Sequence, residues 1–333
     1  MSNDDARIRE FLKGERARSI QALEVLISIV NSIEYEQLRK AADSFKLGIN
    51  RVFLLQAFPA AMQRYAQYHS EWPRRISERA FLFAVDHGRP PSDEEATQLQ
   101  QQVQDELDAE LRPDLEPVKD SDVFDYRVSE KMAREEAVAM GRDAHNASVV
   151  IQAWMCFEVL CGDVWIPAVN ASPDILGRHC NQRLAKEDRV NWDDLARAEF
   201  DVRDKVGTLL ARRMRFQSLE KIRGAFHYAF DKDYSPELRA VFENSGLRRL
   251  ERTRHLLVHK GGRVDSAFAR ANGDDPVLGS VPVGDELRIS NVLTTDFWIT
   301  AAELGGRLLA CVNAWLIKNV AYSKLGGTPD YLI

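Results

Sequence analysis

Cysteine, long apolar runs and an excess of positive charge are all scarce in this chain of 333 residues. The four cysteines show no CxxC spacing, so we expect buried thiols and neither a disulfide framework nor a zinc site. The longest apolar runs, such as Val25–Val30, are much shorter than the roughly 18 residues of a membrane span. The opening stretch MSNDDARIRE is charged from its fourth residue, so we expect no signal peptide and predict a cytoplasmic protein.

The composition is that of a globular chain with a substantial core. Apolar residues make up 45% and charged residues 29% of the chain, so neither a metal nor a disulfide is needed to hold the fold. At roughly 150 residues per domain, the length predicts two domains or one domain with an extension. We predict an N-terminal helical region over residues 1–88, an acidic linker or arm over 89–125, and a helical bundle domain over 126–333.

The charge is unevenly distributed along the chain. The net charge of −6 excludes bulk polycation behaviour toward nucleic acid. Residues 89–125 hold twelve acids and three bases, whereas residues 239–263 hold seven bases and two acids. A local basic surface on an acidic protein attracts a polyanion without making the whole molecule bind one non-specifically.

Apolar residues recur at helical spacing along most of the chain. Over residues 5–86 the spacing predicts one buried stripe, formed by Ile20, Leu23, Ile27, Val30 and Ile33. Residues 93–111 are polar and rich in Gln and Glu, which predicts an exposed helix. Stronger apolar patterns predict four further helical regions, over residues 149–169, 193–230, 235–262 and 294–319.

Local signals define the third of these regions most sharply. Ser235–Glu237 is a helix start, with Ser as N-cap and Pro at the first helical position, and Gly261–Gly262 is the matching stop. Asn244–Gly246 is expected to divide the region into two short helices. Leu278–Val283 and Glu286–Ser290 flank a Gly-Asp turn and predict a β-hairpin. The predicted fold class is therefore all-α: a helical bundle with a four-helix core, a small β-hairpin and an N-terminal helical extension.

The end of the third region carries a basic stripe. At 100° per residue, one helix face opposite Leu250 and Leu257 holds two arginines and two histidines. These four residues are Arg248, Arg252, His255 and His259. Arg254 falls about 140° from His259 around the same helix.

Imidazole and guanidinium groups at one site fit the cleavage of an RNA phosphodiester. Attack by the 2′-hydroxyl on the adjacent phosphorus needs a base, an acid for the leaving 5′-oxygen, and positive charge beside the phosphorane. Histidine titrates near neutrality and can do either proton transfer, and arginine can bridge two phosphate oxygens. The helix C-terminus beside His259 favours its protonated form by about 0.3–1 kcal/mol, which points to His259 as the acid. This chemistry requires no metal and no cofactor.

The motif around these residues resembles that of the HEPN domain family. Arg254 and His255, three further residues, His259, a basic residue and Gly-Gly match the family pattern of Arg, a polar residue and His. The Trp154–Glu158 segment and the expected hairpin before the last helix are also similar, and the resemblance covers about residues 145–320. It says nothing firm about residues 1–125.

The resemblance implies a function and a set of partners. Many HEPN proteins are all-α homodimers that act as metal-independent endoribonucleases in toxin–antitoxin, abortive-infection and other anti-phage systems. By this resemblance Arg254 stabilises phosphate charge, His259 acts as acid or base, and His255 orients or assists. Arg252 and Lys260, with Arg248, are expected to hold the RNA backbone. An antitoxin or sensor protein is an expected partner, and residues 1–125 are a candidate surface for it.

Several alternatives stay open at this point. Arg254 can instead be a structural residue paired with a buried acid such as Glu158, because buried charges need partners. His255 and His259 can ligate zinc, although HExxH is absent. The Arg212–Arg215 run is either a solvated helix face or an RNA contact. The whole chain can also be an inactive dimeric module that binds RNA or protein, or a metal-dependent hydrolase.

Overall fold

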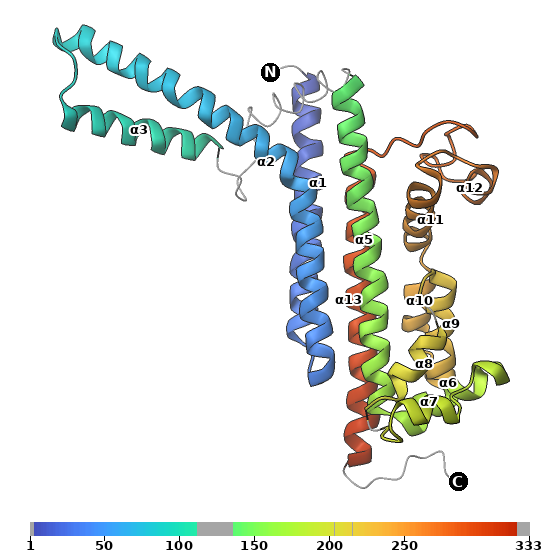
Figure 1. Cartoon of the computed structure of the whole chain (residues 1–333). Coiled ribbons are helices and arrows are strands. Elements are labelled where there is room, and N and C mark those ends of the chain that lie inside the picture. Colours follow the sequence, from blue (N-terminus) through green and yellow to red (C-terminus); the bar gives the residue numbers. More distant parts are fainter. Residues whose placement is uncertain (1–2, 112–135, 203, 215, 325–333) are drawn as a thin grey trace. The chain divides into compact units, whose positions relative to one another are not determined.

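The computed structural model describes residues 3–111, 136–202, 204–214 and 216–324, and it is all-α, as predicted (Figure 1). Its chain divides into two compact units. The hairpin unit comprises residues 1–14 and 54–139, and the bundle unit comprises residues 15–53 and 140–333. The sequence-based boundaries at 88 and 125 do not fall at these divisions, and residues 112–125 of the expected acidic arm lie outside the described residues.

The long helices lie at the beginning, middle and end of the chain: α1 (Asn3–Asn31), α2 (Glu36–His87), α3 (Asp93–Leu111), α5 (Glu136–Ala171) and α13 (Asn291–Lys324). The shorter helices lie between α5 and α13: α6 (Arg178–Arg183), α7 (Trp192–Arg197), α8 (Val206–Met214), α9 (Leu219–Phe230), α10 (Pro236–Glu243), α11 (Ser245–Lys260) and α12 (Ser266–Ala271). Single turns of π- or 3₁₀-helix form at Pro173–Gly177, Lys186–Asp188 and Asp231–Asp233.

The core of the bundle unit is aromatic. Trp154 and Trp165 of α5 and Trp298 of α13 are almost fully buried, and Phe226 and Phe230 of α9 stack with their ring centroids 6.0 Å apart. The buried Trp165 indole donates a hydrogen bond to Ala225 O at 3.1 Å. Burial of these aromatic side chains, together with the many aliphatic side chains around them, is the main contribution to the stability of the unit.

Two adjacent glycines let the N-terminal helices approach α13 closely. A Cβ atom at Gly305 would lie 2.2 Å from the Phe45 ring of α2, and one at Gly306 would lie 3.0 Å from Ile29 of α1. Further along α13, Asn313 Oδ1 accepts hydrogen bonds from the backbone N–H groups that begin α2, including that of Tyr35 at 3.0 Å. Residues 15–53 are therefore packed into the same core as the C-terminal helices.

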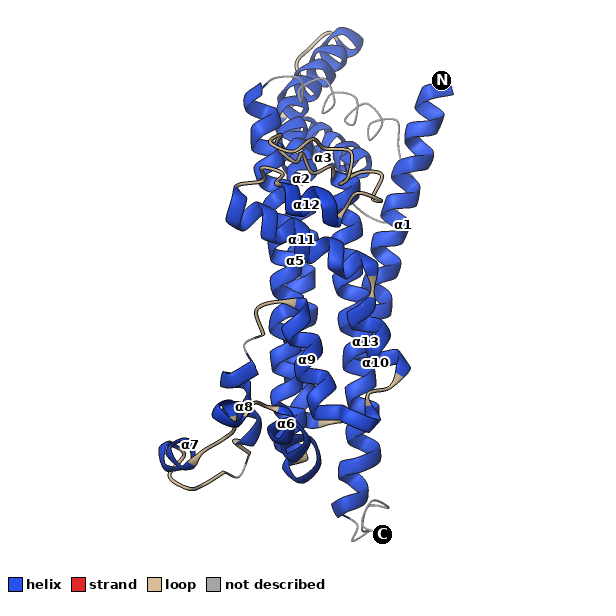
Figure 2. Ribbon diagram, turned by 90° about the vertical axis from the view of Figure 1, so that its right-hand side faces the viewer, coloured by secondary structure: helices blue, strands red, loops and turns tan. Residues whose placement is uncertain are grey.

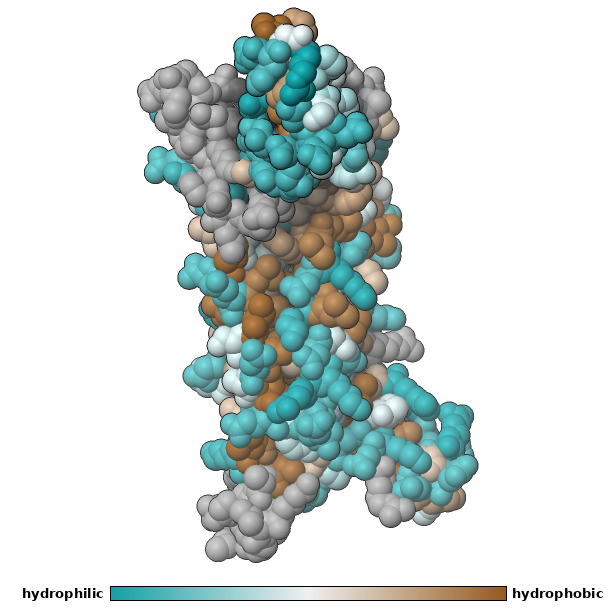
Figure 3. Space-filling view, turned by 90° about the vertical axis from the view of Figure 1, so that its left-hand side faces the viewer, coloured by the Kyte–Doolittle hydropathy of each residue, from teal (hydrophilic) through white to brown (hydrophobic). Residues whose placement is uncertain are grey.

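The predicted stripe of α1 is confirmed in part. Val30 and Ile33 are buried, but Ala22 and Leu26 complete the buried face and Ile27 is 41% exposed. The buried positions 22, 26, 30 and 33 therefore follow helical spacings of four, four and three residues. Figure 3 looks onto the side on which α1 and α2 lie in Figure 1, and apolar atoms interrupt the hydrophilic surface there.

The local signals of the third helical region are confirmed. Ser235 caps α10 by accepting from the Leu238 N–H at 3.1 Å, and Asn244 ends α10 and caps α11 by accepting from Leu247 N–H at 3.2 Å. Gly261 ends α11 in the left-handed conformation, with φ 59° and ψ 32°. Helices α10 and α11 follow one another along α13 (Figures 1 and 2).

Two expectations for the bundle differ from the structure. Residues 193–230 lie in three helices instead of one long region, and positive φ angles at Glu199, Phe200 and Asp204 mark the break between α7 and α8. The expected β-hairpin over 278–290 is not observed, and the described residues contain no β-strand. The backbone around Gly284 instead pairs with the segment after α11: Val264 N–H donates to Asp285 O at 2.9 Å, and a single bridge joins Arg263 to Glu286.

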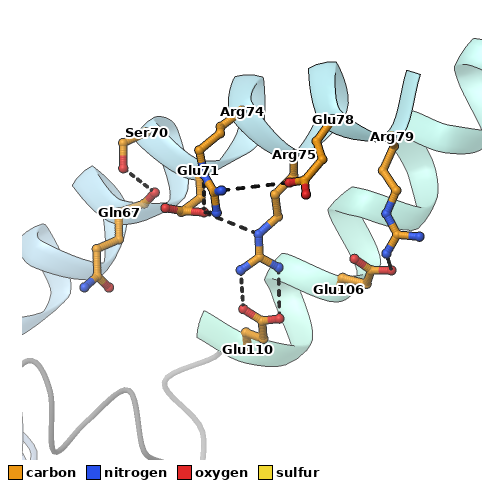
Figure 4. A network of polar contacts seen from close by, with 9 residues as sticks. All are labelled: Gln67, Ser70, Glu71, Arg74, Arg75, Glu78, Arg79, Glu106 and Glu110. Atoms are coloured by element: carbon orange, nitrogen blue, oxygen red, sulfur yellow. Dashed lines mark hydrogen bonds and ion pairs between the residues drawn. The ribbon is translucent and has the colours of Figure 1, made fainter. Parts of the chain in front are cut away.

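The hairpin unit is held mainly by polar contacts. Residues 54–87 of α2 and helix α3 lie antiparallel, and α3 has the bounds expected from the sequence. Arg75 forms two hydrogen bonds with Glu110, at 2.9 and 2.7 Å, and Arg79 donates to Glu106 at 2.8 Å (Figure 4). Among the described residues from 54 to 111, the fully buried apolar side chains are Val103 and Leu107.

One helix is long and apolar enough to cross a membrane by length and composition. This helix is α5, over Ala139–Ala171, and half of its most apolar window is buried within the protein. The same burial is typical of the core helix of a globular domain, and Trp154, Phe157 and Trp165 supply it here. The finding is weak evidence for a membrane span, and we assign α5 to the core of the bundle unit.

The four cysteines are free thiols in the bundle unit, as expected. Cys161 and Cys180 are buried, and Cys156 and Cys311 are half-buried. Burial raises the pKa of Cys156 to about 11 and that of Cys180 to about 12. The thiols therefore stay protonated near neutral pH, which fits a packing role better than a redox role.

Candidate RNA-cleavage site on helix α11

The last two turns of α11 border a pocket of about 360 Å³ that lies entirely within the bundle unit. Trp154 of α5, the segment before α9 and the short helix α12 form its other walls. Helix α11 supplies most of the charged and polar side chains of the pocket: Glu251, Arg252, Arg254, His255 and Lys260. A concave site with apolar walls and a few convergent polar groups is the usual form of a ligand-binding site.

The structure brings together four of the six residues that the sequence nominates. Arg252, Arg254, His255 and Lys260 all line the pocket. His259 is exposed and lies outside the lining, with its ring centroid 4.6 Å from that of His255. Arg248 is also exposed and outside the lining. The pocket thus extends around the end of α11 and is not confined to the basic stripe.

Among the arginine and lysine side chains that line the pocket, Arg254 has the least internal compensation. Its Nε atom is buried without a hydrogen-bond partner, and the described residues give it no ion pair. No ion pair joins it to Glu158, whose Oε2 accepts a hydrogen bond from the Trp154 indole at 2.5 Å. The alternative in which Arg254 and Glu158 form a structural pair is therefore not observed. A buried, unpartnered guanidinium N–H is costly, and an anionic ligand would satisfy it.

The other charged groups of the pocket have partners within the protein. Glu251 Oε1 accepts from the Leu219 N–H at 2.6 Å, so this carboxylate caps the start of α9. Arg252 donates to Ala271 O of α12. Lys260 Nζ lies 3.9 Å from Asp265 Oδ2, and Asp265 also caps α12. These contacts fix the pocket walls, and Arg254 is the pocket arginine that has no partner among the described residues.

The two histidines lie at different positions on α11, and only His255 lines the pocket. His255 is one turn before the end of α11 and faces the pocket, whereas His259 occupies the last turn. The terminal carbonyl groups of a helix favour a cation in this turn. Among the described residues, no group of three or more His, Cys, Asp or Glu side chains lies close enough to hold a metal ion.

Part of this pocket could not be found from the sequence motif. Gln217, Ser218, Ala267, Phe268 and Ala271 line it but carry no catalytic signature. Ser218 and Asp265 are recognisable as N-caps, and each accepts a hydrogen bond from the N–H three residues later. That signal places two helix starts and does not show that they converge on α11. Arg212 and Arg213 do not line the pocket, and Arg215 lies outside the described residues.

Comparison with known proteins identifies no relative of this chain. No protein-family model, no curated protein and no solved structure matches it. The resemblance to the HEPN family therefore stays a prediction, and the geometry of the pocket is the basis for a functional proposal.

Proposed function

We propose that the chain is a metal-independent endoribonuclease of the HEPN type, belonging to a toxin–antitoxin or anti-phage defence system. The observation that carries this proposal is the unpartnered guanidinium of Arg254 beside His255 in one pocket, with the His259 ring 4.6 Å from that of His255. A phosphate at Arg254 would lie next to two groups that can transfer protons at neutral pH.

The proposed reaction is transfer of the phosphate to the neighbouring 2′-hydroxyl. One imidazole takes the 2′-hydroxyl proton as the oxygen attacks phosphorus. The other gives a proton to the leaving 5′-oxygen, so the products are a 2′,3′-cyclic phosphate and a 5′-hydroxyl. In this proposal His259, in the last turn of α11, is the acid, and His255 is the base or orienting group. Arg254 stabilises the charge that grows on the phosphorane.

The remaining basic residues hold the RNA. Arg252 and Lys260 line the pocket, and Arg248 lies one turn before Arg252 on α11. None of these three side chains is held in a buried ion pair with another described residue, so all three can contact successive phosphates. By the resemblance, the active form is a homodimer in the cytoplasm, and an antitoxin or sensor protein restrains it.

The test is cleavage of single-stranded RNA by the full-length protein in EDTA. Arg254→Ala, His255→Ala and His259→Ala are each expected to lower the rate by about 10²–10³, the usual loss for one electrostatic donor or acid–base group. His87→Ala and Arg307→Ala are matched controls, because both side chains are exposed and lie outside the pocket. RNA with 2′-O-methyl groups should not be cleaved.

One observation favours a second function, an inactive RNA- or protein-binding module. His259 lies outside the pocket lining, so a phosphate at Arg254 contacts one histidine more readily than two. This alternative predicts RNA binding that depends on Arg254 with no cleavage by any variant. A metal-dependent hydrolase is a third outcome, and its activity would be lost in EDTA.

A further inference from the structure

The pocket on α11 is larger than a phosphate site requires. Its volume is about 360 Å³, and apolar side chains form one part of its wall beside the charged and polar groups. Trp154, Leu256 and Phe268 are buried at its walls, and Ala267 and Ala271 form the exposed edge on α12. Apolar walls do not stabilise a phosphate, so this part of the pocket fits a different portion of a ligand.

Two polar side chains at the edge of the pocket can form hydrogen bonds with that portion of the ligand. Gln217 lines the pocket and makes no hydrogen bond with any described residue, and its amide carries both donors and an acceptor. The Ser218 hydroxyl oxygen accepts from the Lys221 N–H at 3.4 Å, which leaves its own O–H to donate. A planar group with apolar faces and polar edges matches this combination of walls and edge.

We propose that the pocket binds one extruded nucleobase of single-stranded RNA, with the 3′-phosphate of the same nucleotide at Arg254. This inference rests on the proposed function and adds the position and chemistry of the recognised nucleotide. Bases of single-stranded RNA splay out and pack against aromatic and apolar side chains, which Trp154 and Phe268 provide here. Gln217 and Ser218 then contact the edge of the base.

Calorimetry with small probes tests the base site directly. The four 3′-mononucleotides are titrated into the full-length protein, with inorganic phosphate as the probe that lacks a base. At least one nucleotide is expected to bind about tenfold or more tightly than phosphate, since packing of one base is worth about this factor. Ala267→Leu fills the apolar part of the pocket from its exposed edge, so it should remove that preference and leave phosphate binding within about twofold.

A second filling variant and a control keep the result unambiguous. Ala271→Leu should act like Ala267→Leu, because the Ala271 contact to Arg252 uses the backbone carbonyl. Ala310→Leu adds the same volume at an exposed position of α13 outside this pocket and should change nothing. Equal affinity for phosphate and all four nucleotides, or unchanged nucleotide binding in both filled variants, would overturn the base site.

The two proposals fail in different ways. Nucleotide binding is measured without cleavage, so an inactive protein that binds nucleotides through this pocket supports the base site and contradicts the ribonuclease. Cleavage of RNA that depends on Arg254, together with no preference for nucleotides over phosphate, supports the ribonuclease and contradicts the base site.

Discussion

The bundle unit and the α2–α3 hairpin are both helical, but different forces hold them. The bundle encloses Trp154, Trp165 and Trp298 with almost no exposure to solvent. In the described residues of the hairpin, the fully buried apolar side chains are Val103 and Leu107. Ion pairs of Arg75 and Arg79 join α2 to α3. Apolar burial is worth far more per residue than an exposed ion pair. A rigid site therefore belongs on the bundle, where the candidate pocket lies.

Removing aromatic volume should separate the two regions most clearly. Phe226→Ala in the bundle is expected to lower the free energy of unfolding by about 3–5 kcal/mol, because the side chain is fully buried. Phe81→Ala in the hairpin, where the ring is 67% exposed, should change it by less than about 0.5 kcal/mol. Urea unfolding followed by circular dichroism measures both, and equal losses would contradict the comparison.

Adding volume at a helix contact should have the next largest effect. Gly305→Ala places a methyl group 2.2 Å from the Phe45 ring and 2.9 Å from Leu160, so we expect a loss of about 1–3 kcal/mol. Gly162→Ala is the control, since a Cβ at Gly162 meets nothing within 4 Å. It should stabilise α5 by up to about 1 kcal/mol through helix propensity. The same denaturation experiment distinguishes the two signs.

Breaking one ion pair of the hairpin should have a small effect that depends on salt. Arg75→Ala removes the contacts to Glu110 of α3 and is expected to cost about 0.2–1 kcal/mol, less in 1 M salt. Arg74→Ala is the matched variant, because Arg74 pairs with Glu71 and Glu78 of its own helix. Hydrogen exchange of α3 should increase in Arg75→Ala alone; equal exchange in both variants would show that the pairs between helices contribute nothing.

The smallest expected effect is a loss of order at the hairpin turn in acid. Hydrogen bonds from Arg89, and then from Ser92, lower the pKa of Glu95 to about 2 from an ordinary 4.5. A lowered pKa in the folded state stabilises the fold above about pH 4.5, and this contribution is lost as the pH falls toward 2. Exchange protection around residues 88–95 should therefore decrease between pH 5 and 3. Glu95→Gln should remove that pH dependence.

Short-range signals were sufficient for many helix boundaries. Ser235, Asn244 and Gly261 mark the ends of α10 and α11 because each acts on backbone groups within a few residues of itself. The β-hairpin predicted over residues 278–290 is not observed, because its backbone pairs with residues outside that segment. Its turn forms, but the backbone around Gly284 finds its partners in residues 262–264, which local pattern does not reveal.

In the candidate site, too, some features follow from the local sequence and others from residues that are distant in the sequence. The motif on α11 nominates Arg254, His255 and His259, and helix geometry alone places Arg254 away from His259. The structure adds that Arg254 has no carboxylate partner within the described part of the chain and shares a pocket with His255. Whether an arginine is neutralised depends on which carboxylates lie near it in space. Glu158, the acid suggested by the sequence, accepts a hydrogen bond from the Trp154 indole.

The amino-acid sequence by itself determined the helical class, the capped ends of α10 and α11, and the basic character of the α11 terminus, because spacing, capping and charge act over one or two helical turns. Only the tertiary structure decided which surfaces surround that terminus. Trp154, Ser218 and Phe268 come from three separate segments, and packing of the bundle brings them to one pocket. The energy that selects such an arrangement lies in burial across distant parts of the chain, which no local pattern encodes.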